Sequence, residues 1–136
     1  MEYTIRTCEI ADLPKLVILC QKHAEYEKAD YDSTGKEEGL IKALFDEQPQ
    51  LHCLVVSTPN DIVGYVSYSF LYSTWDAGNI IHMDCLYLEE QARNYGIGEV
   101  LINKLNFKIL KTNLVSFGEV CFFIDCLCYK TWSSIH

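Results

Sequence analysis

The sequence has little positive charge for its length. It contains 11 Lys and Arg residues against 19 Asp and Glu residues, and its formal net charge is −8. A protein that holds nucleic acid or an anionic membrane by charge alone needs a basic surface. The shortage of basic residues therefore argues against both of these partners and fits a cationic one. Many cytoplasmic enzymes are this acidic, so charge alone does not define the partner.

Long apolar segments are also missing. No run reaches the ~18 apolar residues that a membrane span requires. The first six residues, Met1-Glu2-Tyr3-Thr4-Ile5-Arg6, lack the apolar core of a secretory signal. We therefore expect a cytoplasmic protein with no membrane segment and no secretory leader.

The cysteines lack the spacing of a metal site or of a disulfide framework. Their number, seven, is odd, and no Cys-x-x-Cys occurs. The one Cys-x-Cys pair, Cys126 with Cys128, has no cluster of His residues beside it. This pattern favours free thiols that pack as small apolar side chains in a reducing compartment. We expect no metal.

The chain is long enough for one domain, residues 1–136, and 49% of its residues are hydrophobic. Apolar periodicity predicts strands over residues 4–8, 51–57, 62–72 and 80–88, and helices over residues 12–28, 37–45 and from 97 onward. A last strand, or a strand and a bend, is expected over 115–127. Asp12 is the expected N-cap of the first helix, with Pro14 in its first turn. This order predicts an α/β (α+β layered) domain with a mostly antiparallel sheet.

The strongest local motif is Arg93-Asn94-Tyr95-Gly96-Ile97-Gly98, between a predicted strand and a predicted helix. Two glycines allow positive φ and close approach of a ligand, and a helix N-terminus attracts anions. Arg93 adds a cation, so a pyrophosphate fits. The dinucleotide fingerprint G-x-G-x-x-G is absent because Leu101 takes its last position. The alternative is a turn that merely starts a helix.

The R-x-x-G-x-G pattern resembles the coenzyme A pyrophosphate loop of the GNAT acetyltransferases. The flanking sequence resembles the diamine (spermidine/spermine) acetyltransferase branch of that superfamily. The matching segments are Tyr26-Glu27-Lys28, His52-Cys53-Leu54-Val55-Val56, Ile62-Val63-Gly64-Tyr65, Tyr72-Ser73-Thr74-Trp75 and Asp84. The resemblance covers residues 3–105 and implies a GNAT-like antiparallel sheet flanked by helices.

The resemblance also implies an activity: transfer of an acetyl group from acetyl-CoA to a primary amine of a small polyamine. It assigns pantetheine binding to Leu86, Tyr87 and Leu88. It assigns pyrophosphate binding to Arg93, Asn94, Tyr95, Gly96, Ile97, Gly98 and Glu99. It places the substrate amine near Tyr26, Glu27 and Asp84, where Asp84 attracts the cation and relays its proton. The family has Glu at the position of Asp84, and the Asp side chain is one methylene shorter than that of Glu.

Each of these assignments has a structural alternative. Asp84 is otherwise a solvated or turn-capping acid, and Tyr26 and Glu27 are otherwise an exposed helix end. His52 and His82 lie in apolar strands, where a hydrogen-bonded core histidine is favoured over a catalytic base.

The resemblance stops after Phe107, and residues 106–136 diverge. The family continues with an Asn, an Ala and a Phe-Tyr pair whose Tyr protonates the departing thiolate, and nothing here matches. Tyr129, the one tyrosine in this segment, has the wrong context. A shifted frame or early end in the gene explains this, or a natural short variant does. We expect an incomplete C-terminal part and a homodimer that buries residues 115–127.

Three functions are therefore compared. The first is an amine N-acetyltransferase. The second is a truncated or vestigial acetyl-CoA-binding protein with little turnover, favoured by the missing segment. The third is an unrelated nucleotide-binding module, disfavoured by the matches around residues 26, 52–56 and 84.

Overall fold

The computed structural model describes residues 1–75, 77–112 and 116–117, with side chains described through residue 106. Its elements follow the predicted order. They are β1 (Thr4–Thr7), η1 (Ile10–Asp12), α1 (Leu13–Tyr26), α2 (Lys36–Phe45), β2 (His52–Ser57), β3 (Ile62–Ser73), β4 (Gly78–Leu88), η2 (Glu90–Ala92), α3 (Ile97–Thr112) and β5 (Ser116–Phe117).

The strands form one sheet in the order β1-β2-β3-β4-β5. Strands β1 to β4 pair with one another in antiparallel fashion, which confirms the predicted mostly antiparallel sheet. The short β5 pairs with β4 in parallel, through Ile80 with Ser116 and Ile81 with Phe117. The remainder of the predicted 115–127 strand lies outside the described residues, as do Cys126, Cys128 and Tyr129.

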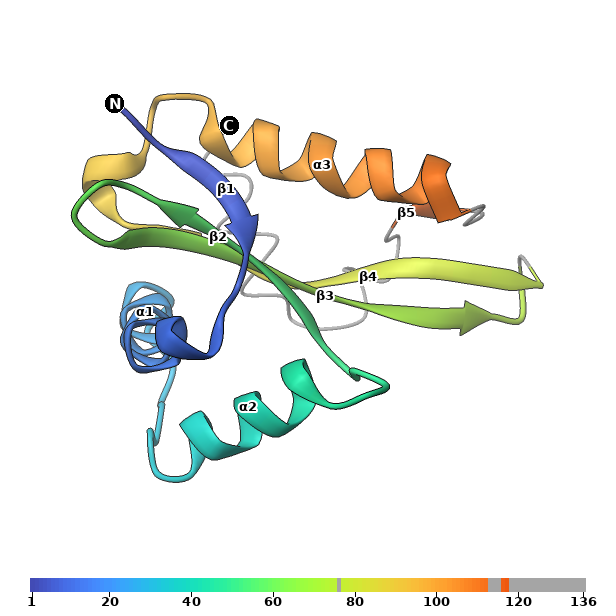
Figure 1. Ribbon diagram of the computed structural model, residues 1–136, viewed down its shortest axis with the longest axis horizontal. Helices are drawn as coiled ribbons and strands as arrows, with labels where there is room; N and C mark the ends of the chain where they lie inside the picture. Colours follow the sequence, from blue (N-terminus) through green and yellow to red (C-terminus); the bar gives the residue numbers. More distant parts are fainter. Residues whose placement is uncertain (76, 113–115, 118–136) are drawn as a thin grey trace.

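The helices lie on both faces of the sheet: α3 covers one face, and α1 and α2 cover the other (Figure 1). Strand β2 shows why both faces are apolar. Its alternate residues Leu54 and Val56 join the cluster under α3, whereas Cys53 and Val55 join the cluster under α1 and α2. Burial of both faces of a strand favours this continuous apolar run.

Helix α3 packs on the sheet through the apolar face that the spacing of residues 97, 101, 105 and 109 predicts. Ile97, Leu101 and Leu105 are fully buried against the sheet, whereas Val100 is 37% exposed. The fourth predicted member, Ile109, lies beyond the described side chains. The face therefore anchors the first part of α3, which positions its N-terminus at the end of β4 (Figure 1).

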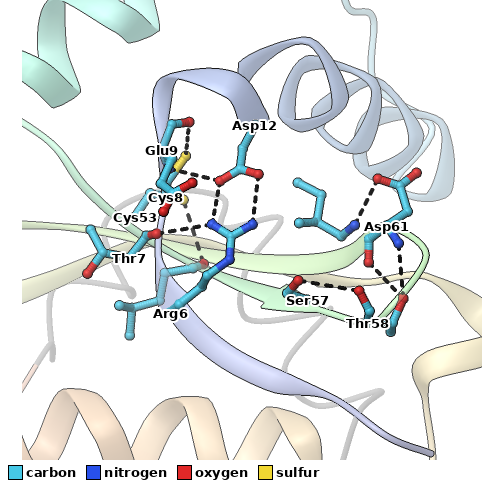
Figure 2. Close-up of polar contacts among 11 residues, drawn as sticks. Arg6, Thr7, Cys8, Glu9, Asp12, Cys53, Ser57, Thr58 and Asp61 are labelled. Carbon is cyan, nitrogen blue, oxygen red and sulfur yellow. Dashed lines mark hydrogen bonds and ion pairs between the residues drawn. The ribbon is translucent and has the colours of Figure 1, made fainter.

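The start and end of α1 differ from the prediction. The helix ends at Tyr26 rather than residue 28, because Lys28 has a φ of 57°, outside the helical region. Asp12 occupies the N-cap position, but its side chain makes no capping bond to α1. It accepts hydrogen bonds from the Arg6 guanidinium at 2.6 and 2.9 Å and from the Glu9 amide, joining β1 to η1 (Figure 2).

No helix within the described ranges is both long and apolar enough to cross a membrane. In the part of the chain that the structure describes, Cys8, Cys20, Cys53 and Cys85 form no disulfide. Among the described residues, no group of three or more His, Cys, Asp and Glu side chains is placed to hold a metal ion.

Candidate active site

The loop before α3 has two residues with left-handed backbone conformation. Gly96 has a φ of 75°, as its residue type allows. The second is Asn94, with a φ of 69°, rather than Gly98, which is buried in the first turn of α3. Asn is one of the few residues that accept this conformation. The prediction of positive φ is thus right for Gly96 and wrong for Gly98.

This loop presents backbone amides at an open surface. The first hydrogen bond that ties α3 to the loop runs from the Val100 amide to the Gly96 carbonyl, at 3.2 Å. The amides of the preceding turn are the donors that a helix N-terminus leaves unpaired within the helix. Asn94, Tyr95 and Gly96 are exposed, and a Cβ on Gly96 would meet nothing within 4 Å. Such an arrangement can bind a phosphate group.

Arg93 is fixed by contacts with the protein itself. Its Nε donates a hydrogen bond to the Leu88 carbonyl at 2.9 Å. Its guanidinium carbon lies 4.6 Å from the centroid of the Tyr26 ring and 5.6 Å from that of Tyr87. The guanidinium is therefore held over two aromatic rings, which attract a cation.

The end of β4 lies beside this loop. Leu86 and Leu88 are buried in the cluster under α3, and Tyr87 is buried in the cluster under α1. Within the described part of the chain, β5 pairs with β4 only at Ile80 and Ile81. Beyond these two pairs, no described strand lies beside the end of β4, at Leu86, Tyr87 and Leu88.

Asp84 lies at a bulge in the same strand. Ser67 pairs with Cys85 and Tyr68 pairs with Met83, so Asp84 is the extra residue between them. A bulge re-aims the side chains around it and is frequent next to active sites. The Asp84 side chain is exposed and accepts a hydrogen bond from the Ser67 hydroxyl at 3.2 Å.

A cavity of about 60 Å³ lies between the sheet and the two helices α1 and α2, and Asp84 and Ser67 line it. Its other walls come from leucine side chains, thiols and Tyr65. Burial raises the pKa of one of these thiols, Cys20, to about 11, so this thiol stays neutral. The cavity thus combines one carboxylate with an uncharged wall.

The two helix residues assigned to the substrate lie at the C-terminal end of α1. Cys20, which lines the cavity beside Asp84, is six positions before Tyr26, which corresponds to about 9 Å along a helix. The Tyr26 ring lies against Arg93. Glu27 follows as the C-cap. The structure thus brings Tyr26 to the predicted coenzyme loop.

The two strand histidines are packing residues. His52 stacks on Tyr68, with ring centroids 5.3 Å apart. His82 is 8% exposed, so its predicted burial is correct. Its Nδ1 has no hydrogen-bond partner in the described structure, contrary to the expected hydrogen-bonded histidine.

Sequence reasoning missed Glu89, which follows β4. This carboxylate is 6% exposed and pairs with Lys22 at 2.7 Å and with Lys15 at 3.5 Å, both from α1. Burial by itself raises the pKa of Glu89, but hydrogen bonds from Lys22 and Gln91 outweigh it, and the pKa lies below its usual value. No spacing signals this contact, since Lys22 and Glu89 are 67 positions apart.

The chain matches the acetyltransferase (GNAT) family over residues 16–116. Since this match covers well over half of the chain, the protein belongs to the GNAT acetyltransferase family. It is similar to the thialysine N-epsilon-acetyltransferase of Bos taurus, with 36% identity over 109 residues. That match covers 74% of this chain and 64% of the relative, so the chain spans less than two thirds of the relative's length.

Solved structures share the fold. A possible acetyltransferase from Clostridium difficile 630 superposes with a TM-score of 0.73 at 23% identity, covering 86% of this chain and 78% of that one. A predicted acetyltransferase from Clostridium acetobutylicum, solved with acetyl-CoA, has a TM-score of 0.72 at 14% identity, covering 86% and 79%. These likenesses confirm the GNAT-like fold.

Proposed function

We propose that this protein is an N-acetyltransferase that transfers an acetyl group from acetyl-CoA to a primary amine of a small polyamine or diamine-like substrate. The observation that carries the proposal is the placement of two features on one strand. Asp84 lies at the bulge of β4, and the amide-rich loop follows the end of that strand, four residues further at Leu88. Four residues of a strand span roughly 13 Å. An extended coenzyme along β4 would thus connect the loop to Asp84.

The residues present fit acetyl-CoA. The amides of Asn94, Tyr95, Gly96, Ile97, Gly98 and Glu99 would hold its pyrophosphate, with Arg93 nearby as a cation. The backbone of Leu86, Tyr87 and Leu88 would hold the pantetheine arm along the end of β4. Acetyl-CoA supplies the acetyl group as an activated thioester.

Asp84 would prepare the amine. A protonated amine is not a nucleophile, so a base must accept its proton directly or through water. The exposed Asp84 carboxylate attracts the cation, and the Ser67 hydroxyl steadies one of its oxygens. A water molecule can make up for the shorter reach of Asp compared with Glu. A backbone amide of β4 would stabilise the oxyanion that forms on attack.

A second function is acetyl-CoA binding with little turnover. It is favoured by residues 106–136, which lack the family's Asn and Tyr segment. The two functions share the coenzyme site and differ in turnover. For both we propose a cytoplasmic homodimer that acts on a small molecule and binds neither nucleic acid nor membranes.

The deciding experiment measures acetyl transfer from acetyl-CoA to spermidine and to a panel of small diamines. The release of free thiol from the coenzyme reports the reaction. Turnover supports the enzyme. Absence of turnover, together with an acetyl-CoA-induced rise in melting temperature, supports the second function. Asp84→Asn should abolish turnover and leave coenzyme binding intact, whereas a wild-type rate would remove Asp84 from the mechanism.

The coenzyme site has its own test. Acetyl-CoA should raise the melting temperature, and NAD and ATP should not. Gly96→Asp should abolish this rise by placing a carboxylate in the anion site. Gly35→Asp is the matched control, because Gly35 has a φ of 74° and equally open surroundings. Normal coenzyme binding by the Gly96 variant would refute the loop assignment.

A further inference from the structure

The side chains that line the cavity beside Asp84 indicate which kind of substrate group it can hold. Helix α1 contributes Leu16 and Cys20, helix α2 contributes Leu40 and Leu44, and β2 contributes Cys53. All of these side chains are uncharged at neutral pH. The cavity is therefore an apolar chamber whose charged group is the carboxylate of Asp84.

The other polar groups on the wall are already engaged. The Tyr65 hydroxyl contacts Nδ1 of His23 at 3.2 Å, in the layer beneath α1. The Ser67 hydroxyl donates to Asp84. A second ammonium pushed into the chamber would lose its hydration without meeting another carboxylate among the described lining residues, which is strongly unfavourable. An alkyl chain would gain from leaving water.

The volume of the cavity limits how much of an alkyl chain it can hold. An engineered protein cavity of about 150 Å³ holds benzene, a molecule of six carbon atoms. In proportion, a cavity of about 60 Å³ holds ~two to three carbon atoms.

We propose that this cavity is a subsite for an uncharged, apolar arm of ~two to three carbon atoms, attached to the carbon that bears the ammonium group attracted by Asp84. The inference rests on the proposed function and narrows its substrate class. The cavity favours primary amines with a short apolar arm. A diamine can still bind with its second nitrogen in solvent, but it then gains nothing from the cavity.

The test compares n-butylamine with 1,3-diaminopropane, which replaces the terminal methyl of butylamine by an ammonium group. Binding is measured by isothermal titration calorimetry to the protein saturated with coenzyme A, so no turnover is needed. We expect butylamine to bind at least about tenfold more tightly than 1,3-diaminopropane, because each apolar carbon group buried in the cavity contributes favourable binding free energy. Equal affinities, or tighter binding of the diamine, would overturn the inference.

Variants of Leu44, a half-buried residue of α2, locate the effect. Leu44→Phe fills the cavity and should weaken butylamine about tenfold while leaving methylamine, which has no arm, unchanged. Leu44→Glu supplies a second carboxylate and should reverse the preference toward 1,3-diaminopropane. Ile18→Phe is the control, since Ile18 is 47% exposed on α1 and does not line the cavity. Unchanged amine preference in both Leu44 variants would overturn the inference.

The outcome separates the two proposals. If coenzyme A and acetyl-CoA fail to raise the melting temperature, the proposed function fails. The same amine titrations on the coenzyme-free protein then still report on the cavity. If the coenzyme binds and the amines are not discriminated, the inference alone fails.

Discussion

The guanidinium carbon of Arg93 lies 4.6 Å from the centroid of the Tyr26 ring, which joins the C-terminal end of α1 to the loop before α3. The resemblance assigns these residues to different ligands, Tyr26 to the amine and Arg93 to the coenzyme. We infer from their contact that Tyr26 helps to hold the loop before α3, which we propose binds the coenzyme. The free energy of such an exposed cation–π contact is about 0.5–1 kcal/mol, and about 2 kcal/mol when it is desolvated.

Tyr26→Leu should therefore weaken acetyl-CoA binding by about 0.5–2 kcal/mol, measured by calorimetry. Tyr26→Phe keeps an aromatic face and should bind nearly as well as the wild type. Tyr31→Leu is the matched control, because Tyr31 carries a comparable contact with Lys36, at 5.6 Å, away from the loop. A change in the KM for the amine with unchanged acetyl-CoA affinity would instead support the role that the resemblance assigns.

Replacing Glu89 should cost stability. Glu89→Gln removes a buried charge between Lys15 and Lys22, and we expect the free energy of unfolding to fall by about 1–3 kcal/mol in urea titrations. Asp61→Asn also removes a partner of Lys15, at 3.2 Å, but that carboxylate is 53% exposed. An exposed pair contributes little, so this control should change stability by less than about 1 kcal/mol. Equal effects of the two substitutions would contradict the importance of the buried site.

Glu89 also predicts a pH dependence. Its pKa in the folded protein is lowered from the ordinary value of 4.5. A lowered pKa means that the stabilising contribution is complete above the unfolded-state pKa and is lost as the pH falls through the folded-state pKa. Below about pH 4.5, stability should therefore fall less steeply in Glu89→Gln than in the wild type. Parallel curves of unfolding free energy against pH would refute this.

Gly64 should not tolerate a side chain. A Cβ there would lie 2.5 Å from Cδ2 of Leu88 and 2.8 Å from the Tyr87 carbonyl oxygen. We expect Gly64→Ala to lower stability by about 1–3 kcal/mol through overpacking, and to weaken acetyl-CoA binding by displacing the end of β4. In contrast, Gly39→Ala, in α2 with nothing within 4 Å, should raise stability by about 0.5–1 kcal/mol. Thermal unfolding of both variants checks the pair, and a harmless Gly64 substitution would argue against this close packing.

The proposed homodimer concerns residues 115–127, most of which lie outside the described part of the chain. An exposed apolar sheet edge promotes association. Light scattering should give a dimer over a wide concentration range. A monomer under all conditions would contradict this.

Much of the fold could be predicted because its signals are local. The β-rich run over residues 51–57, and the spacing of Ile97, Leu101 and Leu105, express which side chains leave water, and packing confirmed both. The element ends were less accurate, since Asp12 uses its carboxylate on Arg6 rather than on the helix. Whether such a side chain bonds its own helix or a residue elsewhere depends on which groups the fold brings near it.

The sequence by itself determined the family, the layered antiparallel fold and the position of the R-x-x-G-x-G loop, because residue order and short-range spacing carry these. Only the tertiary structure decided what surrounds Asp84 and what holds Arg93. The bulge opposite Ser67, the contact of Arg93 with Tyr26 and the burial of Glu89 all join residues distant in the chain. Such contacts depend on how the sheet and helices pack, and no periodicity along the chain encodes them.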